Sequence, residues 1–291
     1  MKYLFSAALV LLAAGSAVFA ANPLRTVTTD AKSEPESITV APDGALILGS
    51  ASKPVIYRAA KGESEAKIFI NAFAEGPVRF LGVLADAKTN SLWACQIGKA
   101  PDSDNRRTTL RSFDLTSGAS KFRWALPGDN NLCNDFTLAT DGTLYVSDTL
   151  ASRIYRVRPN AQAGELVIED PALNGIDGIT FLDGVMYVNN VKDNMLYRVP
   201  LDISGKAGPL QQIQPDQPLK APDGMRAAHG KLFLAENAGG RADMLTIEGD
   251  KAKVTVLLDG LVTPTAIEPA GDVLWIGDRG ADKAVAIPLP K

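Results

Sequence analysis

The chain is poor in the residues on which much enzyme chemistry depends. Its 291 residues include one histidine, His229, and two cysteines, Cys95 and Cys133. A single imidazole excludes any catalytic or metal site that needs two, and two thiols are too few for a disulfide-rich scaffold or a four-thiolate zinc site. The sequence Gly-x-Ser-x-Gly does not occur, so the nucleophile motif of many serine hydrolases is missing as well.

The charge balance and the hydropathy pattern exclude two further classes of protein. Thirty Lys and Arg residues against 33 Asp and Glu residues leave a net charge of −3, and no basic run exceeds Arg106-Arg107. A protein that binds nucleic acid through its phosphates needs a basic surplus or patch, so we expect no nucleic-acid partner. After the N-terminal segment, no stretch approaches the ~20 apolar residues of a membrane-spanning helix.

The first twenty residues have the pattern of a secretory signal peptide. Lys2 is followed by an apolar stretch over residues 3–14, and Ala20 closes a small-residue cleavage site with Val18 three positions from the cut. This order is typical of a segment that is cleaved during export. We therefore expect cleavage after Ala20, a mature domain over residues 21–291, and export, most simply to a bacterial periplasm. An uncleaved N-terminal membrane anchor is the alternative.

The mature chain lacks helical periodicity and is built from short alternating runs rich in Val, Ile, Leu and Tyr, separated by Gly, Pro and Asp-Gly turns. This pattern is typical of an all-β protein. One unit, a strand, a tight turn and a second strand, recurs along the chain. We find it at residues 38–50, 82–96, 136–148, 179–190, 225–236 and 266–278.

A third strand is expected after every hairpin, and a fourth after all but the last, where the chain ends. The orphan strand expected at residues 24–29 would supply the missing strand. Six four-stranded antiparallel sheets of ~45 residues each, with the ring closed by the N-terminal strand, describe a six-bladed β-propeller. We expect one domain with no linker.

Polar residues recur at the start of the innermost strand of the predicted blades. Alignment of the hairpins on their turns places six residues in one column: Glu36, Phe80, Asn134, Asp177, Asp223 and Thr263. In a propeller these positions converge on the central axis. Asp and Asn at strand starts often bind only local backbone amides. Three converging carboxylates would repel one another, however, and a divalent cation would remove that repulsion. An all-oxygen donor set favours Ca²⁺, with Mg²⁺, Mn²⁺ or Zn²⁺ as alternatives.

The same residues carry a resemblance to a known family. The block Pro222-Asp223-Gly224-Met225, the following Gly230-Lys231-Leu232, and Asn237-Ala238-Gly239-Gly240-Arg241 resemble the regucalcin/gluconolactonase family of six-bladed β-propellers. Pro35-Glu36-Ser37 and Asn134-Asp135 are similar to other rim positions of the family in order and blade.

The resemblance implies hydrolysis of a sugar lactone at one divalent metal. By position, Glu36, Asp177 and Asp223 would be metal ligands, and Asn134 would contact the substrate and lie near the metal. Two departures matter. Asp177 stands where the family usually has Asn, which adds negative charge, and Leu132 stands where some members carry a substrate-binding Arg.

A mechanism follows from this donor set. The cation would polarise the lactone carbonyl while a water molecule attacks it. Asp223 or Asp135 would accept the proton of the water, Asn134 would orient the ring, and Phe80 would narrow the cavity for a less polar substrate. A non-catalytic periplasmic propeller that binds a ligand or a protein, with a structural cation, is the alternative. A propeller enzyme of another chemistry, like strictosidine synthase, is a third reading.

The two cysteines lie near the same end of neighbouring predicted blades. Cys95 falls at the end of a second strand, and Cys133 directly precedes Asn134. In an exported protein these thiols can form a disulfide, which would hold the segment that carries Asn134. Two small buried thiols are the alternative.

Overall fold

In the computed structural model, which describes residues 23–99 and 106–291, almost all regular structure is β-strand. The expected signal peptide, residues 1–20, lies outside the described residues. Within the described residues, the helical elements are short 3-10 segments: η1 (Phe73–Glu75), η2 (Pro171–Leu173) and η3 (Arg279–Ala281). None of the described helices is long and apolar enough to cross a membrane. The all-β class expected from the alternating pattern is therefore confirmed.

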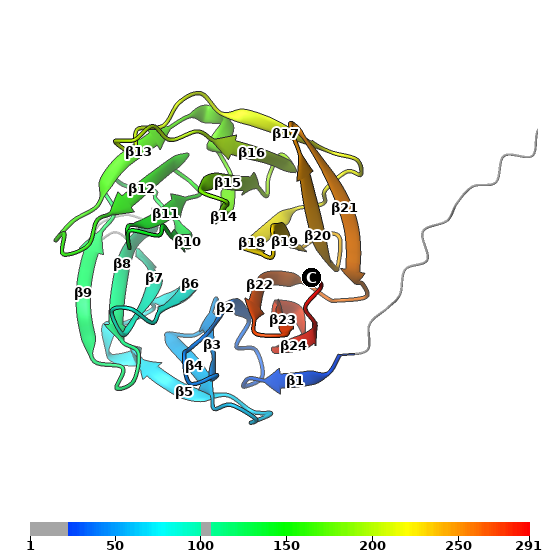
Figure 1. The fold of residues 1–291 in the computed structure, drawn as a ribbon. Coiled ribbons are helices and arrows are strands. Elements are labelled where there is room, and N and C mark those ends of the chain that lie inside the picture. Colours follow the sequence, from blue (N-terminus) through cyan, green and yellow to red (C-terminus); the bar gives the residue numbers. More distant parts are fainter. Residues whose placement is uncertain (1–22, 100–105) are drawn as a thin grey trace, which may run out of the picture.

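The strands pair antiparallel in groups of four consecutive neighbours (Figure 1). The first two groups are β2 (Pro35–Val40), β3 (Leu46–Ser50), β4 (Val55–Ala59) and β5 (Lys67–Asn71), then β6 (Arg79–Asp86), β7 (Ser91–Lys99), β8 (Arg106–Asp114) and β9 (Ser120–Ala125). The next two are β10 (Cys133–Leu138), β11 (Leu144–Asp148), β12 (Arg153–Val157) and β13 (Glu165–Glu169), then β14 (Ile176–Leu182), β15 (Val185–Asn190), β16 (Met195–Val199) and β17 (Gln211–Pro215).

The last groups close the ring. They comprise β18 (Pro222–Ala228), β19 (Lys231–Glu236), β20 (Arg241–Glu248) and β21 (Lys251–Leu258), and then β22 (Pro264–Ala270), β23 (Val273–Asp278) and β24 (Lys283–Pro288) with β1 (Arg25–Thr28). β1 pairs antiparallel with β24, with Arg25 opposite Ala286. The N-terminal strand therefore completes the C-terminal sheet, as its orphan position in the sequence predicts.

The first strand of each group lies nearest the centre of the ring in Figure 1. β2, β6, β10, β14, β18 and β22 each contact the next in this order, and β22 contacts β2. Residues at the starts of these inner strands are therefore brought together around one axis. These residues are tens of positions apart along the chain, but the closed ring brings them close together in space.

Local sequence explains the tight turns between the first and second strands. Asp183 and Gly184, and likewise His229 and Gly230, have positive φ angles of 50° and 79°, and of 50° and 70°. A two-residue hairpin turn needs positive φ at both positions, which Gly and Asp tolerate best. His229 is exposed in its turn, at the end of β18 opposite the strand starts.

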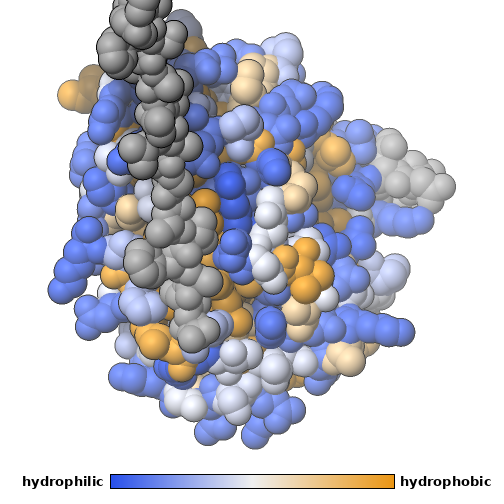
Figure 2. Space-filling model, turned by 90° about the vertical axis from the view of Figure 1, so that its right-hand side faces the viewer, coloured by the Kyte–Doolittle hydropathy of each residue, from blue (hydrophilic) through white to orange (hydrophobic). Residues whose placement is uncertain are grey.

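The core lies between neighbouring sheets. Apolar side chains from facing strands form buried clusters, such as Tyr187 of β15 and Leu196 of β16 with Leu232 and Leu234 of β19. On the face shown in Figure 2, hydrophobic residues form small separate patches among hydrophilic ones wherever grey atoms do not cover them. Most apolar side chains are thus buried where one sheet packs against the next.

A disulfide links Cys95 of β7 to Cys133 of β10, with the two Cα atoms 5.4 Å apart. Cys133 is the first residue of its strand and directly precedes Asn134. Of the two possibilities that the sequence left open, the structure has the covalent one. The bond joins two neighbouring sheets beside the central axis.

Candidate functional site

The predicted site residues lie at irregularities of the inner strands. The pairing of β10 with β11 shifts between Cys133 and Phe136, so Asn134 and Asp135 have no regular cross-strand partner. Shifts of the same kind frame three further predicted residues: Glu36, Asp177 and Asp223. A bulge of this kind bends the strand and redirects its side chains. The local backbone therefore aims polar side chains at the axis rather than into the sheet.

Four of the predicted side chains line the same two cavities. Two spaces share these side chains: a cavity of about 310 Å³, called the upper cavity below, and a small space of about 10 Å³. The shared residues are Glu36, Asn134, Asp177 and Asp223. They are between 5% and 8% exposed. Since the same residues border both spaces, they form the floor that separates the two. The structure thus brings together side chains from four different sheets.

The carboxyl groups on this floor have raised pKa values. Burial raises the pKa of Glu36 well above its usual value, and the charge of Asp223 adds to the effect. Burial, then the charges of Asp223 and Glu36, raise the pKa of Asp177. Burial likewise raises the pKa of Asp223 to about 7, although a hydrogen bond from Asn237 opposes the shift. Without a compensating cation, three ionised carboxylates are unfavourable here.

Two amide side chains hold the acids in place. The Asn134 Nδ2 donates to Asp177 Oδ2 at 2.7 Å and to Thr149 Oγ1 at 3.1 Å. The Asn237 Nδ2 donates to Asp223 Oδ2 at 3.2 Å. Asn134 therefore bridges the sheets that carry it and Asp177. In the described part of the chain, however, no group of three or more His, Cys, Asp and Glu side chains is arranged to hold a metal ion.

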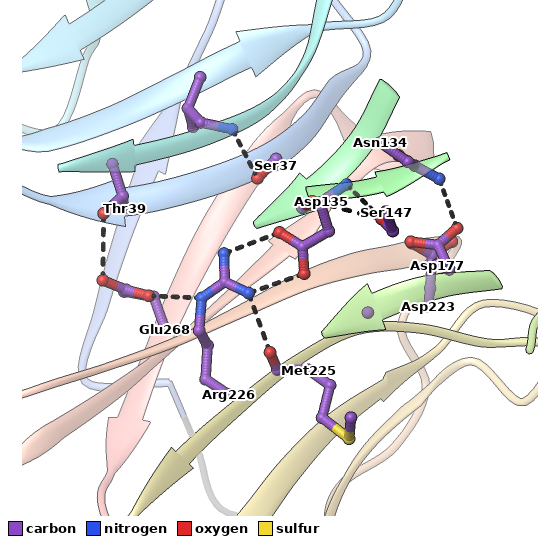
Figure 3. A network of polar contacts seen from close by, with 12 residues as sticks. Ser37, Thr39, Asn134, Asp135, Ser147, Asp177, Asp223, Met225, Arg226 and Glu268 are labelled. Atoms are coloured by element: carbon purple, nitrogen blue, oxygen red, sulfur yellow. Dashed lines mark hydrogen bonds and ion pairs between the residues drawn. The ribbon is translucent and has the colours of Figure 1, made fainter. Parts of the chain in front are cut away.

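Beneath the floor, a charged network crosses the axis (Figure 3). Arg226 of β18 donates to both carboxylate oxygens of Asp135, at 2.7 and 3.0 Å. Its Nε donates to Glu268 Oε2 of β22 at 3.2 Å, and Glu268 Oε1 accepts from Thr39 Oγ1 at the same distance. Asp135 thus has both oxygens engaged by one guanidinium. Inner strands of four sheets are tied together by this network.

Two positions of the aligned column are misplaced by the sequence analysis. Phe80 pairs with Gln96 ahead of the bulge in β6, is fully buried, and packs against Phe113 at 6.2 Å between ring centroids. The side chain that borders the upper cavity is its neighbour Leu81. Leu81, rather than the predicted Phe80, therefore borders the cavity. Counted back from the observed end of β6 at Asp86, Leu81 has the place that Asp177 and Asp223 have in β14 and β18.

The position of Thr263 is corrected in the same way. Thr263 precedes β22, and Thr265 is the residue that borders the small space under the floor. The Thr265 Oγ1 donates to the backbone carbonyl of Glu36 at 2.8 Å. The turn after β22 has two residues, like the turns after β14 and β18, and counting back from the observed strand end puts Thr265, not Thr263, in the column with Asp177 and Asp223.

Several residues of the site carry no signal strong enough to be selected from the sequence. The upper cavity is bordered by three arginines, Arg79, Arg106 and Arg279, and the network below depends on Arg226 and Glu268. The one available clue is that Arg226 and Glu268 are charged residues in the middle of inner strands. The upper cavity also has apolar walls: Ala51, Leu81, Ile97, Leu132 and Val191.

Comparison with known proteins identifies the fold. No protein-family model matches the chain, and no curated protein matches it in sequence. Among solved structures, a candidate gluconolactonase is similar at a TM-score of 0.69 and 18% identity, over 91% of both chains.

Two further similar structures are enzymes of other kinds. Virginiamycin B lyase from Staphylococcus aureus has a TM-score of 0.65 at 13% identity, over 91% of this chain and 99% of the other. The PQQ-bound aldose sugar dehydrogenase from Streptomyces coelicolor has a TM-score of 0.65 at 16% identity, over 92% and 98%. At such low identity the similarity establishes a β-propeller and leaves the chemistry to the site.

Proposed function

We propose that this chain is an exported six-bladed β-propeller that hydrolyses a lactone, or a related carboxylic ester, at one divalent cation. The observation that carries the proposal is the floor of the upper cavity, where three buried carboxylates from three sheets border one space. Burial raises the pKa of each of them, and neighbouring carboxylates add to the shift, which a bound cation would reverse. The similarity to a candidate gluconolactonase is consistent with this function.

The donor chemistry of the floor fits a hard cation. Glu36, Asp177 and Asp223 offer carboxylate oxygens, and Asn134 adds an amide. Oxygen donors of this kind favour Ca²⁺ over softer metals, with Mg²⁺, Mn²⁺ or Zn²⁺ as alternatives. These four residues would hold the ion. When bound, the cation would polarise the lactone carbonyl and stabilise the oxyanion that develops on it.

The residues of the chain would perform the remaining steps. A water molecule adds to the lactone carbonyl carbon, the ring carbon–oxygen bond breaks, and a hydroxy acid results. Asp223 would accept the proton of the attacking water, because both oxygens of the alternative base, Asp135, already accept hydrogen bonds from Arg226. Asn134 would orient the substrate from the floor. Leu81 and Leu132 would contact its less polar part.

The test combines metal binding and turnover on the same samples. Mature protein stripped with a chelator is titrated with Ca²⁺ by calorimetry, beside Asp223→Asn and the control Asp250→Asn, which changes an exposed acid in the turn after β20. A panel of lactones is then assayed with and without Ca²⁺. We expect binding and hydrolysis in the parent and in the control, and the loss of both in Asp223→Asn.

Other outcomes would change the conclusion. Binding of Ca²⁺ without hydrolysis of any lactone would favour a propeller that binds a ligand or a protein. If Ca²⁺, Mg²⁺, Mn²⁺ and Zn²⁺ all fail to bind, the acidic floor is structural and the hydrolase proposal fails. Export is tested separately: the mass of the exported protein should correspond to a chain that begins at residue 21, after cleavage following Ala20.

A further inference from the structure

The upper cavity has basic side chains on one wall in addition to its acidic floor. Arg79 of β6 and Arg106 of β8 both border this cavity. Both also border an adjoining cavity of about 350 Å³ between the first two sheets. Both arginines therefore lie where the two cavities meet.

The strand register places the two arginines on one face of their sheet. β7 lies between β6 and β8, with Arg79 opposite Ile97 and Arg106 opposite Lys99. Cross-strand partners share a face, and so do residues two apart in one strand. Arg79, Ile97 and Arg106 consequently present side chains to the same side, which is the side that borders the cavity.

Neither arginine is neutralised by an acid within the described residues. Most other arginines there have a carboxylate partner, such as Arg279 of the same cavity, which lies 2.8 Å from Glu34. Arg79 makes a single long hydrogen bond, at 3.5 Å, to the carbonyl oxygen of Ala51. Two guanidinium groups on a cavity wall, with no acidic partner in the described part of the chain, are suited to an external oxyanion, which they can bind through paired N–H donors.

We propose that Arg79 and Arg106 form a subsite for an oxyanionic group of the substrate, a carboxylate or a phosphate, while its ester carbonyl lies at the acidic floor. This inference rests on the proposed function and adds a substrate class to it. The apolar side chains of Leu81, Ile97 and Leu132 border the same cavity. The expected substrate thus has an anionic end, an apolar or cyclic middle, and a lactone or ester carbonyl.

The inference is tested by binding, which does not depend on turnover. The probes are tetrahydrofuran-2-carboxylate, tetrahydrofurfuryl phosphate and the neutral tetrahydrofuran-2-carboxamide, none of which contains a lactone. Their affinities for the full mature protein in Ca²⁺-containing buffer are measured by ligand-observed NMR up to 50 mM. The variants are Arg79→Gln and Arg106→Gln. The matched control is Arg107→Gln, because Arg107 is adjacent on β8 but borders a different cavity.

We expect one of the anionic probes to bind the parent about 10-fold or more tightly than the carboxamide, as charge-assisted hydrogen bonds predict. Whichever anion shows the preference identifies the group as a carboxylate or a phosphate. The preference should fall by about 10-fold in each subsite variant, persist in Arg107→Gln, and weaken with added salt. Equal affinity for all probes, no binding to the parent, or an equal loss in Arg107→Gln would overturn the inference.

Turnover separates this inference from the function on which it rests. The substrates are 5-oxotetrahydrofuran-2-carboxylate and its carboxamide, an anionic and a neutral form of one γ-lactone. If the parent hydrolyses both with equal kcat/KM and the subsite variants change neither, the hydrolase proposal stands and the subsite fails. If the anionic ether binds as expected and no lactone is hydrolysed, the subsite stands and the hydrolase proposal fails.

Discussion

Arg226 and Asp135 form a bidentate ion pair across the central axis, although they are 91 positions apart in the chain. Both side chains are nearly buried, at 11% and 7% exposed. A buried ion pair of this kind adds little net stability relative to apolar packing. Loss of one partner, however, leaves the other charge buried without a counter-charge. The pair therefore makes the inner ring sensitive to single substitutions.

Replacement of Arg226 by Met should lower the free energy of unfolding by about 3–5 kcal/mol, because Asp135 and Glu268 would both lose their buried cation. Urea denaturation measures the change. Arg153→Met is the control: its partner Glu169 is half exposed, so less than about 1 kcal/mol is expected. Similar small losses in both variants would contradict the structural role of Arg226.

The disulfide should stabilise the protein by holding β7 to β10. With a sequence separation of 38 between the bonded cysteines, the loop-entropy relation gives about 4 kcal/mol at most, and 2–4 kcal/mol is typical. Denaturation of Cys95→Ala/Cys133→Ala against the oxidised parent measures it. Two reactive thiols in the native parent, found by thiol titration, would show that the bond is not formed.

Stability should fall as the pH rises from weakly acidic to alkaline, partly through Asp243. Burial raises the pKa of Asp243 to about 8, and the hydrogen bond and charge of the neighbouring Glu236 add to this shift. Since the folded-state value lies above the unfolded one, the native state binds the extra proton. The associated stability is fully present below about pH 4 and is lost as the pH approaches and passes 8.

The pH prediction is checked by urea denaturation between pH 5 and 9 for the parent and Asp243→Asn. The slope associated with one proton is at most about 1.4 kcal/mol per pH unit. The Asn variant should show a flatter profile, because its amide does not titrate. A profile that is unchanged by the substitution would contradict the assignment to Asp243.

Close approach of two inner strands at the site depends on Gly178. A Cβ atom at this position would lie 2.6 Å from the backbone oxygen of Asp223, whereas one at Gly98 would have no atom nearer than 3.6 Å. Gly178→Ala should therefore cost about 1–3 kcal/mol and displace Asp177 from Asp223. Gly98→Ala, the control, should stay within about 0.5 kcal/mol by thermal unfolding. Equal effects would show that the strands separate easily.

If the acidic floor binds Ca²⁺, the ion should stabilise the native state. At a free concentration 100 times its Kd, the gain is about 2.7 kcal/mol. Thermal unfolding with Ca²⁺ and with a chelator measures the shift, which should be absent in Asp223→Asn. A parent whose unfolding temperature does not respond to Ca²⁺ would argue against the cation site.

Local sequence patterns determine the fold class and most of the acidic floor. Alternation of period two sets which face of each strand is apolar, and Asp183-Gly184 or His229-Gly230 imposes a tight turn. Repetition of this unit predicts the ring and the pairing of β1 with β24. Glu36, Asn134, Asp177 and Asp223 meet because they occupy equivalent places in the unit.

The tertiary structure alone decided what depends on exact register and on partners across the ring. The turn after β6 has four residues and no Asp-Gly pair, so only the structure shows where this strand ends and that Leu81 rather than Phe80 borders the cavity. The Arg226–Asp135 pair and the Cys95–Cys133 bond join residues on different sheets. The ion pair depends on the summed twist and packing of the sheets from β10 to β18, which no local pattern specifies. The disulfide joins neighbouring sheets, and the positions of the two cysteines left open whether it forms.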